Sequence, residues 1–159
     1  MTKAQFPSPD HDHDACLARS LERARAGFEA KGGRLTALRE AVLRELAASH
    51  QALGAYDIMH RLGERGRQVA PISVYRVLDS LLEAGLIHRL ESGNAYVACH
   101  QTHEPQRPIL FLVCERCGAV AEASPEVLSE ALDSTAKDAG FALAQSVLEA
   151  RGLCAHCAG

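Results

Sequence analysis

Two Cys-x-x-Cys pairs are the most specific chemical feature of the chain. The first pair is Cys114 and Cys117, and the second is Cys154 and Cys157. Two residues between cysteines let both sulfurs reach one ion at about 2.3 Å, and four thiolates complete the tetrahedron that zinc accepts. Redox dithiols or free thiols are the other chemistry open to such residues. Because two pairs occur together, the spacing predicts one closed structural zinc site.

A looser group of metal-ligand residue types lies around the middle of the chain. Its members are His88, Cys99, His100, His103 and Glu122. Ligands drawn from two halves of the chain and from the linker between them would let one ion clamp the orientation of those halves. On spacing alone, surface histidines and one buried thiol explain these residues equally well.

Residues 73–84 form the clearest amphipathic helix in the sequence. One stripe at helical spacing is apolar, namely Val74, Val77, Leu78, Leu81 and Leu82. The outer face offers Ser73, Tyr75 and Arg76. In a DNA major groove an arginine can pair with guanine, and a tyrosine can contact a thymine methyl group or a phosphate. The same face also fits a helix that is merely solvated.

The elements around this helix favour DNA binding. Helices are predicted over residues 15–30, after the capping residue Thr36, and over 56–65. Two short strands, residues 86–90 and 95–99, flank a Gly-Asn turn and predict a hairpin. Three helices, an amphipathic helix and a hairpin are the order of a winged helix-turn-helix domain.

The carboxyl half predicts a small αβ unit. It contains an apolar strand at 109–113, a second strand at 118–123, a helix that starts at Ser124-Pro125, and a last strand at 141–149. Because about 50 residues bury little apolar surface, such a unit favours a metal staple and a partner chain. The fold class is therefore α+β, a winged-helix domain followed by a small dimerisation domain that zinc staples.

These elements divide the chain into four parts. Residues 1–15 form a His- and Asp-containing tail, 16–99 the winged-helix domain, 100–108 a metal-binding hinge and 109–159 the dimerisation domain with the structural zinc.

Charge and composition support two different roles for the two halves. The 159 residues have a net charge of −3, but residues 17–90 hold 12 Lys and Arg against 8 Asp and Glu, whereas residues 91–159 hold 4 against 9. The basic half can face an anionic partner. No apolar run approaches the roughly 18 residues of a membrane span, and the amino terminus lacks the apolar core of a secretory signal. We therefore expect a cytoplasmic protein with no membrane partner, where cysteine pairs are metal ligands before they are disulfides.

Several motifs together resemble the ferric-uptake-regulator superfamily. They are Leu35-Thr36 with Arg39, Ala55-Tyr56-Asp57, Val74-Tyr75-Arg76-Val77-Leu78, Gly85-Leu86-Ile87 and the two cysteine pairs. The segments 94–100 and 149–154 are similar to the zinc-uptake-regulator branch. The sequence departs from the pattern at Ala37, where a proline is usual, and at Arg107, where a histidine is expected.

The resemblance implies a homodimeric, zinc-responsive repressor that binds an AT-rich inverted repeat in double-stranded DNA. It places the four paired cysteines in a structural zinc site, and His88, Cys99 and Glu122 in a regulatory one, so that at least two zinc ions bind per chain. Tyr75 and Arg76 fall on the recognition helix, next to Ser73. For the fourth regulatory ligand we place His103 ahead of His100, because His100 follows Cys99 directly and would point away on an extended strand.

Three other functions compete with this interpretation. An iron, manganese or peroxide sensor of the same superfamily would use harder ligands than the Cys99 thiolate, which suits zinc. A zinc enzyme would need an open coordination position and a general base, and the sequence has no His-Glu-x-x-His, phosphate loop or nucleophile motif. A zinc-storage protein would not need the helix-turn-helix. We therefore expect no enzymatic activity and no small organic substrate.

Overall fold

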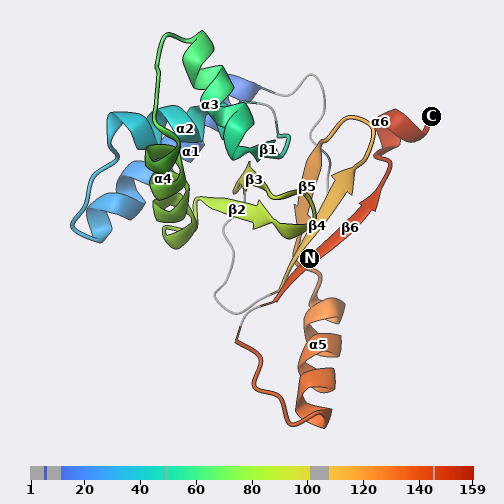
Figure 1. The fold of residues 1–159 in the computed structure, drawn as a ribbon. Helices are drawn as coiled ribbons and strands as arrows, with labels where there is room; N and C mark the ends of the chain where they lie inside the picture. Colours follow the sequence, from blue (N-terminus) through green and yellow to red (C-terminus); the bar gives the residue numbers. More distant parts are fainter. Residues whose placement is uncertain (1–5, 7–11, 49, 101–107, 145) are drawn as a thin grey trace. The chain divides into compact units, whose positions relative to one another are not determined.

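The structure, a computed structural model, describes residues 6, 12–48, 50–100, 108–144 and 146–159 (Figure 1). The described chain divides into two compact units. Residues 12–100 belong to the first unit, and residues 6 and 108–159 to the second. We describe each unit by itself.

The first unit consists of four helices, a short 3-10 turn and three short strands. Its elements are α1 (His13–Ala30), α2 (Ala37–Ala47), β1 (Leu53–Gly54), α3 (Ala55–Glu64), α4 (Pro71–Glu83), β2 (Ile87–Leu90), η1 (Glu91–Gly93) and β3 (Ala95–Ala98). The strands form one sheet in the order β1-β3-β2. This is the predicted order of helices followed by a hairpin.

Local sequence signals explain where these helices begin. Thr36 accepts a hydrogen bond from the backbone N–H of Arg39 and caps α2, as predicted. Asp12 caps α1 in the same way through Ala15 N–H, at 2.9 Å. The helix therefore begins at His13, two residues before the predicted start, and residues 13–15 are its first turn rather than part of a tail.

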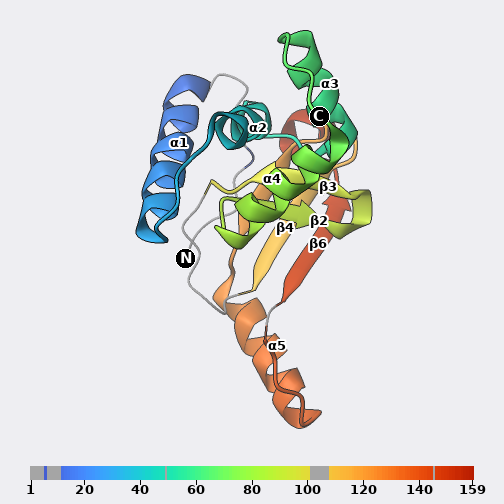
Figure 2. The same ribbon diagram turned by 60° about the vertical axis from the view of Figure 1, so that its left-hand side comes forward.

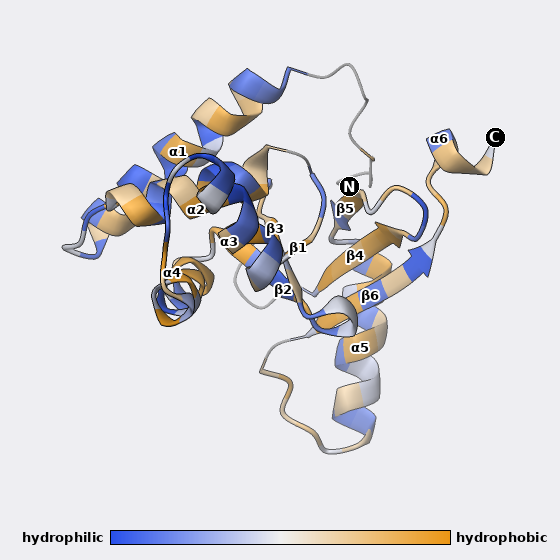
Figure 3. Cartoon of the chain, turned by 45° about the horizontal axis from the view of Figure 1, so that its top comes forward, coloured by the Kyte–Doolittle hydropathy of each residue, from blue (hydrophilic) through white to orange (hydrophobic). Residues whose placement is uncertain are grey.

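The core of the first unit lies between the helices and the hairpin. The predicted apolar stripe of α4 is buried: Val74, Leu78 and Leu81 are fully inaccessible, and Val77 is nearly so. In Figure 3 hydrophobic and hydrophilic residues alternate along α1, which buries one face only. Burial of each aliphatic side chain contributes about 1.5–3 kcal/mol, so this stripe fixes the orientation of α4 and hence of its outer face.

The hairpin has a tight register. β2 and β3 pair antiparallel, with Ile87 opposite Ala98 and His88 opposite Val97. Asn94 closes the turn in the left-handed conformation, at φ 45°, which asparagine tolerates better than most residues. β1 was not predicted, since two residues are too few to show a period.

The second unit is a three-stranded sheet with two helices. Its elements are β4 (Ile109–Cys114), β5 (Val120–Ala123), α5 (Glu126–Asp138), β6 (Val147–Gly152) and α6 (Ala155–Ala158). The strand order is β5-β4-β6, with β4 and β5 antiparallel and β4 and β6 parallel. The central strand β4 is hydrophobic along most of its length (Figure 3).

The prediction of the last strand as residues 141–149 is wrong about its first residue. The strand begins at Val147, because parallel pairing sets Val147 opposite Ile109, the first residue of β4. Residues 141–144 come before the first residue that pairs with β4, so they are not part of the strand. The helix after Ser124 is confirmed, although Pro125 is its N-cap and Glu126 its first residue.

Helix α5 contributes no buried residue to the second unit. Figures 1 and 2 show it beyond one end of the sheet rather than across a face. Its described side chains are exposed or half-buried: Val127 is 72% exposed, and Phe141, just past the helix, is 63% exposed. Among the described residues, no helix has the length and apolar character needed to cross a membrane.

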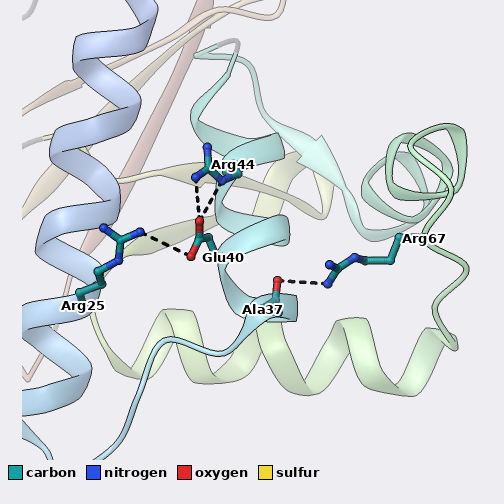
Figure 4. A network of polar contacts seen from close by, with 5 residues as sticks. All are labelled: Arg25, Ala37, Glu40, Arg44 and Arg67. Carbon is teal, nitrogen blue, oxygen red and sulfur yellow. Dashed lines mark hydrogen bonds and ion pairs between the residues drawn. The ribbon is translucent and has the colours of Figure 1, made fainter.

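A polar network ties three segments of the first unit together (Figure 4). Glu40 on α2 contacts Arg44 at 2.7 Å and Arg25 of α1 at 3.6 Å. Arg67, between α3 and α4, donates to the Ala37 carbonyl at 3.1 Å. The hydrogen bond from Arg44 holds the pKa of Glu40 below its usual value. The carboxylate is thus favoured in the folded unit.

We predict that Glu40→Gln lowers the free energy of unfolding by at most about 1 kcal/mol at neutral pH, since the ion pairs are partly exposed. A lowered pKa means that the stabilisation is complete above the unfolded-state pKa and is lost as the pH falls through the folded-state pKa. Urea denaturation of both proteins at neutral and acid pH measures this. A difference that grew on acidification would contradict the prediction.

Candidate metal centres and DNA-facing helix

The parallel pairing of β4 and β6 brings the two cysteine pairs together. It sets Cys114, the last residue of β4, opposite Gly152, so that Cys154 follows two residues later. Cys117 lies in the turn after β4, which Gly118 completes with φ 73°. Cys157 lies on the short helix α6 that Cys154 begins. We call these four residues the four-cysteine cluster.

The four-cysteine cluster fits a zinc ion. All four sulfurs lie within 4.8 Å of one another, and none of these cysteines is in a disulfide. The sulfurs of Cys117 and Cys154 are 3.8 Å apart, and the edge of a zinc–sulfur tetrahedron is also about 3.8 Å, given Zn–S bonds of about 2.3 Å. Cys114 and Cys154 are buried, which suits a closed site. The donor set and its spacing are those of a structural centre.

Backbone groups prepare one sulfur of this cluster as a ligand. The N–H of Cys154 donates to the sulfur of Cys114 at 3.4 Å. Hydrogen bonds from the backbone of Cys154 and Cys117 lower the pKa of Cys114 to about 6. By contrast, the neighbouring Cys154 sulfur, with burial, raises the pKa of Cys157 to about 12. A metal that binds all four as thiolates must therefore displace protons, which makes its affinity pH-dependent.

The hairpin brings together two of the predicted regulatory ligands. His88 lies on β2 opposite Val97, and Cys99 follows β3 two residues after Val97. Side chains two residues apart on a strand share a face, so His88 and Cys99 lie on one face of the hairpin. Their ligand atoms are within 4.8 Å of each other, and the Cys99 side chain is buried. The Cys99 N–H donates to the Leu86 carbonyl at 2.9 Å, which holds Cys99 in register.

The other predicted regulatory ligands lie outside the hairpin. Glu122 lies on β5 in the second unit, buried and opposite Phe111 in register. His103 lies outside the described residues. The ligand atom of His100 lies within 4.8 Å of those of Cys16 and His50, neither of which was predicted as a ligand. No signal in the sequence pairs these three, since they are separated by 34 and 50 positions.

The outer face of α4 is open, as a DNA-facing helix requires. Tyr75 is 36% exposed, Arg76 is exposed and Ser73 is half-buried. The structure adds Ile72, 61% exposed and one helical turn before Arg76, which gives this face an apolar contact as well as a cation. Arg39 donates to Ser80 at 3.0 Å and stacks over Phe28 at 4.4 Å, which fixes α4 against the preceding helices.

The sequence model of the Ferric uptake regulator family matches residues 30–151, which include the hairpin, the exposed helix, Cys114 and Cys117. The chain belongs to this family. The match confirms the resemblance drawn from the motifs.

Individual members of the family differ in how similar they are to this chain. The chain is 44% identical over 124 residues to the Zinc uptake regulation protein of Escherichia coli (strain K12), a match that covers 78% of this chain and 72% of that protein. It is 31% identical over 129 residues to the Ferric uptake regulation protein of Legionella pneumophila, covering 79% and 92%. A solved zinc uptake regulator complexed with zinc and DNA is 38% identical, with a TM-score of 0.79 over 94% of this chain and 97% of that one. These neighbours confirm the predicted α+β fold of the family.

We predict that Cys114→Ser abolishes tight zinc binding by the four-cysteine cluster. Metal binding at such a centre is linked directly to folding of the small unit around it, so the variant should also dissociate or aggregate. Zinc content and size-exclusion chromatography of the purified protein measure both effects. His156→Ala is the matched control, because His156 is exposed between Cys154 and Cys157 and should leave zinc content unchanged. A stable, dimeric Cys114→Ser protein would disprove the assignment.

Proposed function

We propose that this chain is a zinc-responsive transcriptional repressor, which binds operator DNA as a zinc-loaded homodimer and controls genes of zinc uptake. Members of its family are transcriptional regulators, so the chain is a regulator and not an enzyme. We place it in the cytoplasm, where operator DNA and the metal pool that it monitors are both accessible.

The observation that carries the proposal is the hairpin of the first unit. It holds His88 and Cys99 on one face, and α4 precedes it with an exposed tyrosine and arginine. Metal ligands and a DNA-facing helix therefore belong to elements that pack on one small core. A displacement of the hairpin would be transmitted to the helix through that core. A metal-storage protein has no use for such a helix.

The ligand chemistry favours zinc as the metal. Four thiolates suit zinc in the four-cysteine cluster, and we propose a second, regulatory zinc held by His88, Cys99, His103 and Glu122, which makes at least two per chain. The thiolate of Cys99 is a soft ligand that suits zinc and would be easily oxidised beside iron. This distinguishes the chain from an iron, manganese or peroxide sensor. A relative named for zinc at 44% identity supports the choice.

The regulatory mechanism follows from the origin of these ligands. We propose that residues 16–99 are the DNA-binding domain, 100–108 the hinge and 109–159 the dimerisation domain. Bound zinc would supply a fixed tetrahedral centre. The chain's own residues then limit the angle between domains, because His88 and Cys99 belong to the hairpin and Glu122 to the other unit. Recognition helices of a dimer can enter successive major grooves only at one separation.

Exposed hydrophobic side chains of the second unit support the homodimer. Val127, Phe141, Val147 and Leu153 are exposed hydrophobic residues of the second unit. Because solvent exposure of such side chains is costly, a second copy of the chain is the partner that covers them in this proposal. A two-fold dimer presents two equal helices, so the operator should be an AT-rich inverted repeat.

We predict that Arg76→Ala weakens operator binding by about 1–3 kcal/mol, if Arg76 pairs with a base from the exposed face of α4. Zinc content and dimerisation should be unchanged. Gel-shift titration on the operator measures the affinity. Lys137→Ala, which removes an exposed cation from α5, is the matched control for net charge. Equal affinity of Arg76→Ala and the parent would remove this helix from the interface.

We predict that Cys99→Ser keeps the four-cysteine zinc and the dimer but loses most of the zinc response of operator binding. A coupling of about 1–3 kcal/mol, or roughly 5- to 150-fold, is typical of such linkage, and operator DNA must tighten zinc by the same factor. Operator titration at buffered free zinc measures this factor.

The same titration decides the fourth ligand. His103→Ala should reduce the zinc response, whereas His100→Ala should leave most of it, since the ligand atom of His100 lies near those of Cys16 and His50. If only His100→Ala abolishes the response, the assignment of His103 is wrong.

A further inference from the structure

We propose that Cys16, His50 and His100 form a third metal site, inside the first unit, for a divalent cation that prefers sulfur and imidazole, with Zn²⁺ as the first choice. None of these residues belongs to the four-cysteine cluster or to the proposed regulatory set. The inference does not depend on the proposed function, because it concerns metal binding within one unit.

Three separate segments of the first unit meet at this site. Cys16 lies in the first turn and a half of α1, His50 lies between α2 and β1, and His100 follows β3. Their ligand atoms all lie within 4.8 Å of one another. Ligand atoms around a tetrahedral zinc are separated by about 3.3–3.8 Å. A movement of the ligand atoms by about 1 Å is therefore enough to bring all three within bonding distance of one ion.

The two imidazoles are held close together. The ring centroids of His50 and His100 are 4.1 Å apart, and the rings are tilted by 41°. His50 is only 6% exposed. Two imidazoles beside a thiolate are a donor set that zinc binds in proteins.

The backbone fixes two of the three ligands. His50 has φ 48°, one of two non-glycine residues with a positive φ in the described chain. That conformation turns the chain sharply between α2 and β1. His100 is fixed through its neighbour: Arg23 of α1 donates a hydrogen bond to the carbonyl of Cys99. Because Arg23 and Cys16 lie on the same helix, this contact also sets α1 against the end of β3.

Polar groups around the site are compatible with a bound cation. Arg19 donates to the sulfur of Cys16 at 3.3 Å, a contact that orients the side chain from outside the ligand set. His13 lies next to the site, with its ring centroid 5.5 Å from that of His50. His13 or a water molecule can supply the fourth ligand.

The first test is zinc stoichiometry. Cys99→Ser and the double variant Cys16→Ser/Cys99→Ser are dialysed against buffered free zinc, and zinc per chain is measured. In the Cys99→Ser background the regulatory thiolate is absent, so Cys16 is the only single cysteine left outside the four-cysteine cluster. We expect the double variant to hold one fewer zinc per chain. His60→Ala in the Cys99→Ser background is the matched control, because His60 is exposed on α3 and should cost no zinc.

The second test reports ligation by sulfur directly. Co²⁺ added to Cys99→Ser protein that retains zinc only in the four-cysteine cluster should produce a thiolate-to-cobalt charge-transfer absorption, which Cys16→Ser removes. His50→Asn should weaken Co²⁺ binding at least tenfold while far-ultraviolet circular dichroism stays the same, since asparagine tolerates the left-handed backbone. Equal zinc content in the two dialysed variants, or Co²⁺ affinity unchanged by His50→Asn, would overturn the proposal. Loss of operator binding with both metal results as expected would leave it intact.

Discussion

The parallel pairing of β4 with β6 is the contact on which the second unit depends. Forming this contact costs chain entropy, because the long segment between β4 and β6, which includes α5, must close into a loop before the strands can pair. Once it forms, it sets Cys114 opposite Gly152 and delivers the second cysteine pair to the first. A metal at the four-cysteine cluster holds the ends of the same two strands, so strand pairing and ion binding stabilise each other.

The first unit relies on a different constraint, the burial of one face of α4. Val74, Leu78 and Leu81 leave no freedom for the helix to roll, since rolling would expose them to water. Arg39 adds a polar restraint through Ser80. The buried face therefore fixes the orientation of the outer face of α4. Because residues of the outer face are not needed for packing, they can serve contacts with a partner.

Elements with a strong local signal were predictable. The stripe of α4, the cap at Thr36 and the spacing of the cysteine pairs each depend on residues that are close in the sequence. His100 and Cys99 fall in different groups of potential ligands, which agrees with the predicted alternation along an extended chain. The start of β6 was not predictable, since it is determined by where β4 begins. The approach of His50 to His100 was not either, because a turn with positive φ and the packing of α1 decide it.

Cys99 and His100 share one peptide group, yet their side chains belong to two different sets of potential ligands. Both side chains leave the backbone from adjacent Cα atoms on either side of one rigid peptide plane. The hydrogen bond from Cys99 N–H to the Leu86 carbonyl restrains the backbone at this point. A displacement of the backbone at the end of β3 would therefore move both side chains together.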